Sequence, residues 1–281
     1  MCYPLTINSL LVTKTMEATL SFFFATILVL STSHASPSFP SQNHRLLQHS
    51  DGAATSAANH HGHKMSCPSW RLAVETNNII KWTLVPEACE DYVANYMLGS
   101  RYQEDCFAVT SIALEYAKNH TLGADGKDIW VFDIDETALS EIDYYSQPDV
   151  SFGAKKFNET KKNEYLKEAK SPPLAAVLEL YNNLLPLGYK IVFISGTSES
   201  YREYRESNMK RAGYHTWEKL VLKQTSQHGT TSFIYKSKKR TELVKAGYRI
   251  IGNMGDQWSD ILGSDVGNRT FKLPNPMYYI S

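Results

Sequence analysis

Several features that mark special classes of protein are scarce or missing in this sequence. The 281 residues include only four cysteines, 11 prolines and 15 glycines, which excludes disulfide-dense mini-proteins, collagen-like repeats and low-complexity chains. Neither sign of charge is in excess, because 29 basic residues balance 29 acidic ones. A neutral chain gives no electrostatic reason to expect nucleic acid or an anionic membrane as a partner. What remains is the composition of an ordinary folded protein that is large enough for one sizeable core.

The sequence also has no apolar run that is clearly long enough to span a membrane. The run at residues 18–30 is shorter than the roughly 20 residues that a spanning helix needs. Lys14 precedes this run, and the small-x-small sequence Ser33-His34-Ala35 follows it. This order predicts a secretory signal peptide over residues 1–35, with no membrane association after its cleavage. An uncleaved membrane anchor is the alternative interpretation.

Residues 36–66 contain little that could form a core. They are rich in Ser, His, Asn and Ala, and Phe39 is their only aromatic residue. A segment of this composition buries too little apolar area to fold, so a flexible leader is predicted. The start of translation stays open between Met1 and Met16, because the residues before Met16 add nothing to the signal pattern.

A secretory route predicts an oxidising compartment, N-linked glycans and a final location outside the cell or in the vacuole. Three Asn-x-Thr sequons agree with such a route, and three together carry more weight than one. The sequons begin at Asn119, Asn158 and Asn268.

Removal of the signal peptide leaves three cysteines, Cys67, Cys89 and Cys106. Three thiols allow one internal disulfide in three alternative pairings, with the remaining thiol free or bonded between chains. The cysteines lie too far apart in the sequence for a compact zinc site, so a structural role is favoured. The choice between a monomer and a homodimer stays open.

The first part of the expected domain, residues 67–125, has helical periodicity. From Pro86 onward, apolar residues recur at i, i+3, i+4, i+7 and i+8 until Gly99, as expected for an amphipathic helix. Similar spacing continues from Tyr102 to Tyr116. The stripe of tyrosine and methionine is interpreted as core packing rather than as a cofactor surface.

The pattern changes after residue 125, and an α/β core is predicted over 126–281. Residues 128–134 are β-branched and aromatic, which is typical of a strand buried on both faces. A unit then recurs three times: a helical stretch, a Gly-Tyr pair and a short apolar strand. Alternating strands and helices predict a parallel sheet with right-handed crossovers. The glycines, each suited to a left-handed helix end, are Gly188, Gly213 and Gly247, and the strands are 191–194, 220–222 and 250–251.

Carboxylates and a hydroxyl group stand at three of the predicted strand ends, where ligands bind in such sheets. Because clustered carboxylates repel one another, they favour a divalent cation between them. A set of oxygen ligands without paired His or Cys selects Mg²⁺ over zinc. The residues are Asp133 and Asp135 after the first strand, Ser195 and Gly196 after the second, and Asp256 and Asp260 after the last.

Two carboxylates at one strand end can divide the work of catalysis. One of Asp133 and Asp135 is expected to ligate the metal and attack, while the other shuttles a proton. Ser195 and the Gly196 amide suit an anion at the start of the following helix. A phosphoryl dianion also needs a positive partner, for which Lys236 is favoured. The nearby alternatives are Lys223, Lys238 and Lys239.

These motifs, in this order, resemble the haloacid dehalogenase-like phosphohydrolases. The resemblance rests on the Asp-x-Asp-x-Thr tip at residues 133–137, the strand that ends in Ser-Gly, the later lysine and the Gly-Asp-x-x-x-Asp motif at 255–260. Within that superfamily, residues 69–78 and 133–140 are similar to the plant group of class B acid phosphatases and vegetative storage proteins. The resemblance begins at about Cys67 and continues to the end of the sequence.

The resemblance implies an α/β fold with one domain over residues 67–281. Its core is a haloacid dehalogenase-like Rossmannoid parallel sheet, preceded by a helical N-terminal segment. The family inserts its cap between the first two strands, here at about 140–170. Because this segment is short, a rather open cleft is expected, which suits small phosphomonoesters as substrates.

The resemblance also implies a role for each candidate residue. Asp133 would be the nucleophile that forms an aspartyl-phosphate, and Asp135 would protonate the leaving alcohol and then activate water. Ser195, Gly196 and Lys236 would hold the phosphoryl group. The implied Mg²⁺ ligands are Asp133, Asp256 and the Asp135 backbone carbonyl, with Asp260 in support.

A secreted or vacuolar Mg²⁺-dependent acid phosphatase is therefore the leading hypothesis. An acid optimum is expected because Asp135 must hold a proton when the leaving group departs. The alternative is a vegetative storage glycoprotein with weak or incidental phosphatase activity, although the retained Asp133 favours catalysis. A phosphotransferase, in which an alcohol intercepts the aspartyl-phosphate, is the third hypothesis.

Overall fold

The computed structural model describes residues 65–281 of the chain. The predicted signal peptide (1–35) and nearly all of the predicted leader (36–66) lie outside the described residues, so both stay predictions. Within residues 65–281, none of the helices combines the length and the hydropathy that a membrane crossing would require.

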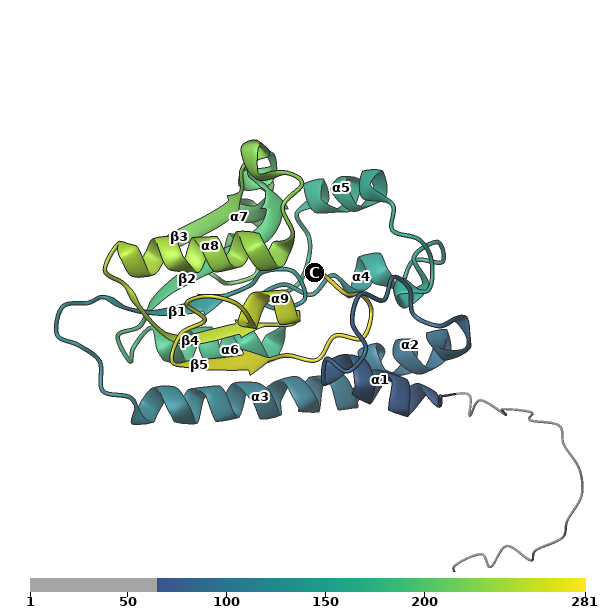
Figure 1. Ribbon diagram of the computed structural model, residues 1–281, viewed down its shortest axis with the longest axis horizontal. Helices are drawn as coiled ribbons and strands as arrows, with labels where there is room; N and C mark the ends of the chain where they lie inside the picture. The colour runs from purple at the N-terminus through teal and green to yellow at the C-terminus, as the bar shows by residue number, and fades with distance from the viewer. Residues whose placement is uncertain (1–64) are drawn as a thin grey trace, which may run out of the picture. The chain divides into compact units, whose positions relative to one another are not determined.

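A five-stranded parallel sheet forms the centre of the described chain (Figure 1). Its spatial order is β3-β2-β1-β4-β5, so β1 lies in the middle. All four neighbouring pairs are parallel, which confirms the predicted α/β fold class. The strands are β1 (Asp128–Phe132), β2 (Lys190–Ser198), β3 (Lys219–Lys223), β4 (Arg249–Gly255) and β5 (Arg269–Lys272).

Helices cover both faces of this sheet (Figure 1). On one face, α3 (Ser100–Asn119) packs against α6 (Ala175–Leu184), and α7 (Arg202–Arg211) contributes Met209 to the same core. On the other face, α8 (Ser232–Lys245) packs on β2 and β4. The remaining α-helices are α1 (Cys67–Glu75), α2 (Glu90–Leu98), α4 (Ile142–Tyr145), α5 (Glu159–Glu168) and α9 (Trp258–Ile261). The short 3-10 helices are η1 (Glu87–Cys89), η2 (Ser151–Gly153), η3 (Glu199–Tyr201) and η4 (Thr225–Gln227).

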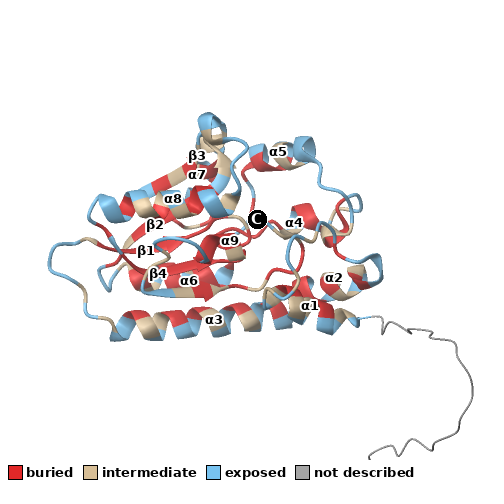
Figure 2. Ribbon diagram, viewed as in Figure 1, coloured by how far each residue is buried: buried red, intermediate tan, exposed pale blue. Residues whose placement is uncertain are grey.

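Strand β1 shows how the sheet is buried on both faces. Trp130 and Phe132 lie in the larger of two apolar clusters, together with side chains of α3 and α6. Ile129 and Val131 lie in the smaller cluster, together with side chains of α8. Because successive side chains of a strand alternate between faces, a strand covered on both faces needs a continuous apolar run. Figure 2 shows the strands mainly in red and the outer surfaces of the helices mainly in pale blue.

The three Gly-Tyr pairs follow the ends of helices, as the sequence predicts. Gly188, Gly213 and Gly247 come after α6, α7 and α8, with φ angles of +94°, +101° and +86°. This left-handed conformation is strained for residues with a Cβ atom, which explains the glycines. Strand β5, in contrast, has no counterpart in the sequence prediction. It is a short edge strand in which only Phe271 is fully buried, so its apolar pattern is weak.

The segment predicted as the cap, residues 140–170, leaves the sheet after β1 and contains the helices α4 and α5. The chain enters and leaves this cap at neighbouring points, residues 139–140 and 172–173, which we call the neck. Leu139 forms an isolated antiparallel bridge with Pro173, and the Ser140 amide donates to the Pro172 carbonyl at 2.9 Å. The two ends of the cap are therefore hydrogen-bonded side by side.

A disulfide joins Cys67 to Cys89, whose Cα atoms are 5.3 Å apart. It links the first residue of α1 to the last residue of η1. Cys106 in α3 is buried and its thiol is free. Of the three pairings that the sequence left open, the structure thus has Cys67–Cys89.

Replacement of both bonded cysteines by serine is expected to lower the free energy of unfolding by about 3 kcal/mol, the loop-closure contribution for a sequence separation of 22. Urea unfolding followed by circular dichroism measures this loss. Dithiothreitol should destabilise the wild-type protein by a similar amount and leave the double-serine variant unaffected. Equal stabilities of the oxidised wild type and the variant would contradict this role of the disulfide.

Candidate active site

The carboxyl ends of β1, β2 and β4 meet at one edge of the sheet. Phe132, the last residue of β1, is paired with Phe193 of β2 and with Met254 of β4. The segments that follow these positions therefore emerge together, as expected for the ligand edge of a parallel sheet. The strand predicted over 128–134 ends at Phe132, so both aspartates of the first motif lie in the turn after β1.

Three buried carboxylates gather at this edge. Oxygen atoms of Asp133, Asp256 and Asp260 lie within 4.8 Å of one another, and each residue is buried. Asp256 is held from outside the cluster by the Thr137 hydroxyl, which donates at 3.1 Å, and by the Asn275 side-chain amide at 2.7 Å. Residues from two separate parts of the chain, the segments after β1 and after β4, thus form one acidic cluster.

Lys236 supplies positive charge to the cluster. It reaches in from α8, and its Nζ lies 2.5 Å from a carboxylate oxygen of both Asp133 and Asp260. Burial raises the pKa of Asp133 well above its usual range, and nearby carboxylates add to the rise, although Lys236 opposes it. Burial would lower the pKa of Lys236, but its two carboxylate partners raise it. Among the alternatives, Lys223 lines the same cavity but donates to the Thr230 carbonyl at 2.6 Å.

The donor set of the cluster suits a hard divalent cation. All its ligand atoms are carboxylate oxygens, and it contains neither histidine nor cysteine. The single positive charge of Lys236 does not balance the negative charges of three buried carboxylates. Asp260, predicted to act in support, belongs to the cluster. The Asp135 side chain lies outside the cluster, which leaves its backbone carbonyl as its only predicted contribution to a metal.

The Asp135 carboxylate is engaged by a separate set of donors. Its Oδ2 accepts hydrogen bonds from the hydroxyl groups of Ser195 at 3.0 Å and Thr197 at 3.3 Å. Its Oδ1 forms an ion pair with Arg205. The sequence predicts that Ser195 holds a phosphoryl group, but Ser195 is fully buried and directs its hydroxyl to Asp135. Gly196, predicted to act with it, does line the cavity.

A chain of buried ion pairs extends from Asp135 to the cap, and no part of it was expected from the sequence. Arg205 of α7 pairs with Asp135 and lies 3.3 Å from the Glu141 carboxylate. Glu141 in turn pairs with Lys162 of α5. Arg205 is separated from Glu141 by 64 residues and from Asp135 by 70, so no local motif signals these contacts. The only sequence signal is an arginine on the helix that follows the Ser-Gly strand end.

The ion pairs shift the pKa values of the two carboxyl groups in opposite directions. Burial would raise the pKa of Asp135, but Arg205 lowers it below its usual range. Burial and the charge of Asp135 raise the pKa of Glu141 to about 7. The sequence argument for an acid optimum places a proton on Asp135. In the structure, Arg205 favours the ionised form of Asp135, and Glu141 holds a proton below about pH 7.

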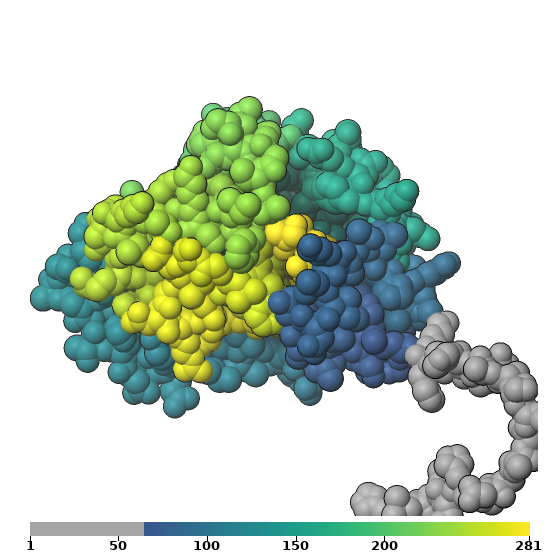
Figure 3. Space-filling model, viewed as in Figure 1, coloured from purple at the N-terminus to yellow at the C-terminus, as the bar shows by residue number. Residues whose placement is uncertain are grey.

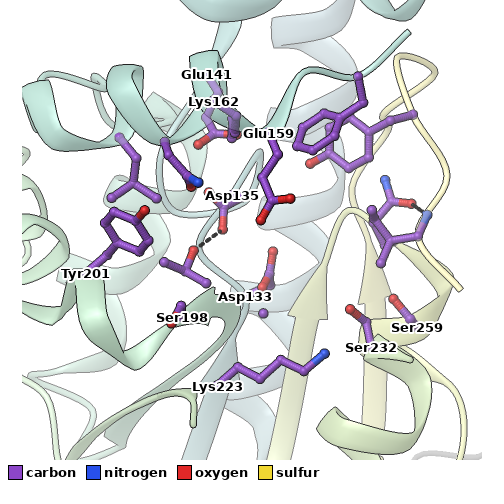
Figure 4. Close-up of a pocket in the computed structure, with 18 of the residues that line it drawn as sticks. Asp133, Asp135, Glu141, Glu159, Lys162, Ser198, Tyr201, Lys223, Ser232 and Ser259 are labelled. Atoms are coloured by element: carbon purple, nitrogen blue, oxygen red, sulfur yellow. Dashed lines mark hydrogen bonds and ion pairs between the residues drawn. The ribbon is translucent and has the colours of Figure 1, made fainter. Parts of the chain in front are cut away.

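A cavity of about 650 Å³ lies over these groups, a volume typical of sites for small molecules. In Figure 4, Asp133 and Asp135 lie at its centre, with Glu141 and Lys162 on the cap side and Lys223 on the opposite side. Figure 3 shows the surface hollowed between the teal cap segment and the green segment above the sheet. The acidic cluster is therefore open to this cavity between residues 140–170 and the sheet.

The relatives of this chain include proteins named as an acid phosphatase, a stem glycoprotein and a vegetative storage protein. Acid phosphatase 1 of Solanum lycopersicum is 45% identical over 217 residues, which cover 77% of this chain and 84% of that protein. The stem 28 kDa glycoprotein of Glycine max is 42% identical over 93% of this chain and 98% of that protein. Vegetative storage protein 1 of Arabidopsis thaliana is 41% identical over 76% of this chain and 79% of that protein.

A solved structure and a family match agree with the fold and the motifs. The class C acid phosphatase from Bacillus anthracis has a TM-score of 0.57 over 68% of this chain and 85% of its own, and its 20% identity restricts the likeness to the fold. Residues 53–281 match the family described as HAD superfamily, subfamily IIIB (acid phosphatase). The carboxylate cluster at the strand ends is thus part of an acid phosphatase, and the chain belongs to subfamily IIIB of the haloacid dehalogenase (HAD) superfamily.

Proposed function

We propose that this chain is a Mg²⁺-dependent acid phosphatase that hydrolyses small phosphomonoesters through an aspartyl-phosphate on Asp133. The observation that carries the proposal is the buried cluster of Asp133, Asp256 and Asp260 with Lys236 at the edge of the sheet. A site for phosphoryl transfer needs a nucleophile and positive charge beside each other, and this cluster supplies both groups.

In the first half-reaction, Asp133 is the nucleophile. One of its carboxylate oxygens attacks phosphorus, and the bond between phosphorus and the ester oxygen breaks. The departing alcohol takes up a proton from Asp135, and Glu141, which lies against the same Arg205 nitrogen and has a pKa raised to about 7, replaces that proton. Lys236 and the Gly196 amide hold the phosphoryl oxygens, while the Ser195 hydroxyl keeps Asp135 in place. The alcohol leaves, and Asp133 carries the phosphoryl group.

In the second half-reaction, water takes the place of the alcohol. Asp135 accepts a proton from water as the water oxygen attacks phosphorus, and the bond between phosphorus and Asp133 breaks. The products are inorganic phosphate and the free carboxylate of Asp133. An alcohol that entered instead of water would give a phosphotransferase, which product analysis in the presence of glycerol distinguishes from a hydrolase.

Mg²⁺ is the proposed cofactor. The residues that would hold it are Asp133 and Asp256, with Asp260 beside them and the Asp135 carbonyl as a further ligand. When bound, it would offset the carboxylate charge and polarise the phosphoryl group. The all-oxygen donor set and its burial support a hard cation rather than zinc.

We also propose that the protein enters the secretory pathway and functions outside the cell or in the vacuole. The asparagines of all three sequons, Asn119, Asn158 and Asn268, are exposed, so glycans would not disturb the fold. The Cys67–Cys89 disulfide is the kind of bond that persists in an oxidising compartment. Both observations support this location.

Storage is a second candidate function, because the relatives include vegetative storage proteins. A storage role needs only a stable, abundant fold, and it is compatible with catalysis in the same chain. The measurement that separates the two is tissue abundance together with specific activity. Abundant protein with negligible turnover would favour storage as the main role.

The activity of the Asp133→Asn variant toward p-nitrophenyl phosphate is expected to be at least about 1,000-fold lower than that of the wild type, because an amide is not a nucleophile for phosphorus. Nitrophenol release measures the activity, and circular dichroism verifies the fold. The matched control is Asp91→Asn, an exposed position in the first turn of α2, which should keep full activity. Full activity in Asp133→Asn would remove Asp133 from the role of nucleophile.

Mg²⁺ should stabilise the wild-type protein, by about 2.7 kcal/mol at a concentration 100 times its dissociation constant, because it binds only the folded state. A thermal shift assay measures this effect independently of catalysis. The shift should be lost in Asp256→Asn and kept in the exposed Asp91→Asn control. A chelator should abolish activity, and added Mg²⁺ should restore it. Full activity after exhaustive chelation, without any thermal shift, would exclude a magnesium enzyme.

A further inference from the structure

Arg205 is almost completely buried beside the reacting groups, yet the reaction described above gives it no task. Its side chain is 2% exposed and it lines the cavity. Removing a guanidinium group from water is costly unless it is well paired, so a buried arginine in an active site needs a physical explanation.

The contacts of Arg205 are with Asp135 and with the residues around it. Its Nη2 pairs with Asp135 Oδ1 and lies 3.3 Å from Glu141 Oε1. Its Nε and Nη2 also contact the Thr197 hydroxyl oxygen, at 3.3 and 3.2 Å. Thr197 is itself a donor to Asp135. Arg205 thus touches Asp135 directly and through one of its other partners.

The hydrogen-bonding pattern shows how the Asp135 carboxylate is oriented. The hydroxyl groups of Ser195 and Thr197 donate to Oδ2, and Arg205 donates to Oδ1. Three donors therefore converge on one carboxylate and fix its orientation. The Asp135 side chain keeps 22% of its surface exposed and lines the cavity, so water can still reach it.

We propose that Arg205 is the positioning residue for the second half-reaction, in which it holds the Asp135 carboxylate as the base that activates water. This inference rests on the proposed function, where Asp135 has that task. In the step concerned, the water proton passes to Asp135, the water oxygen bonds to phosphorus, and the bond from phosphorus to Asp133 breaks. Arg205 exchanges neither a proton nor a bond and acts only through Asp135.

The cap completes the support of Arg205. Glu141 is 1% exposed and lies between Arg205 and Lys162 of α5. Glu141 contacts the same Nη2 of Arg205 that pairs with Asp135, so the guanidinium group is also held from the cap. The orientation of the base is thus coupled to α5, a helix of the cap.

The test is the Arg205→Gln variant with p-nitrophenyl phosphate as substrate. We expect kcat to fall by about 100-fold, the size of a general-base contribution. The value of kcat/KM should stay within about threefold, because it depends only on steps up to transfer to Asp133. KM should therefore fall together with kcat. Rapid mixing should show a burst of nitrophenol close to one molecule per enzyme molecule. Mass spectrometry of acid-quenched enzyme should detect the added mass of one phosphoryl group.

Two further variants separate positioning from other effects. Arg202→Gln is the matched control, since Arg202 lies on the same helix and pairs with Glu199 and Glu206, away from the cavity. It should leave kcat and kcat/KM unchanged. Arg205→Lys retains a single positive charge without the planar fork, so it should have an intermediate kcat. If Arg205→Gln fails to fold, the burst is measured on Arg205→Lys, which keeps a positive charge beside Asp135 and Glu141.

Other outcomes would overturn the inference. A parallel fall of kcat and kcat/KM without a burst, together with weaker inhibition by inorganic phosphate, would make Arg205 a ligand of the phosphoryl group. An unchanged kcat would leave Arg205 with no part in the water step. Either result is distinct from a failure of the proposed function, which would appear as full activity in Asp133→Asn.

Discussion

Three carboxylates confined to one buried pocket repel one another, and the structure around Asp133, Asp256 and Asp260 depends on relieving that repulsion. Lys236 does part of this work from α8, because its ammonium group contacts two of the three. The order of the strands places these residues together, since β4 lies beside β1. A cation and a phosphoryl dianion fit the same charge pattern, one against the carboxylates and the other against the lysine.

Asp133 and Asp135 are two residues apart, but their surroundings divide their chemistry. Burial raises the pKa of Asp133, and nearby carboxylates add to the rise while Lys236 opposes it. Asp135 faces Arg205 and two hydroxyl donors, and its pKa is lowered. Two identical side chains thus acquire different pKa values, Asp133 mainly from burial and Asp135 mainly from Arg205 on α7. Different surroundings of this kind allow one aspartate to attack while its neighbour handles protons.

The sequence was informative where a physical signal is local. Continuous apolar runs and the glycines after helices predicted the central strands, and the acidic residues at strand ends predicted the cluster. Ion pairs between distant segments leave no such signal, so Arg205 and Glu141 were missed, and the disulfide pairing of three cysteines stayed open. The Asp-x-Asp motif also did not show that Ser195 would bond to Asp135, because that contact depends on how β2 approaches the turn after β1.

The neck at Leu139 and Pro173 bears on how such enzymes evolve. Because the cap departs and returns at neighbouring points, a longer, shorter or differently folded insert can be joined there without altering the register of the sheet. Substrate range can then diverge between relatives while the chemical machinery stays intact. The contact of Lys162 with Glu141 sets a limit to this freedom, since a replaced insert must again supply a cation at that place.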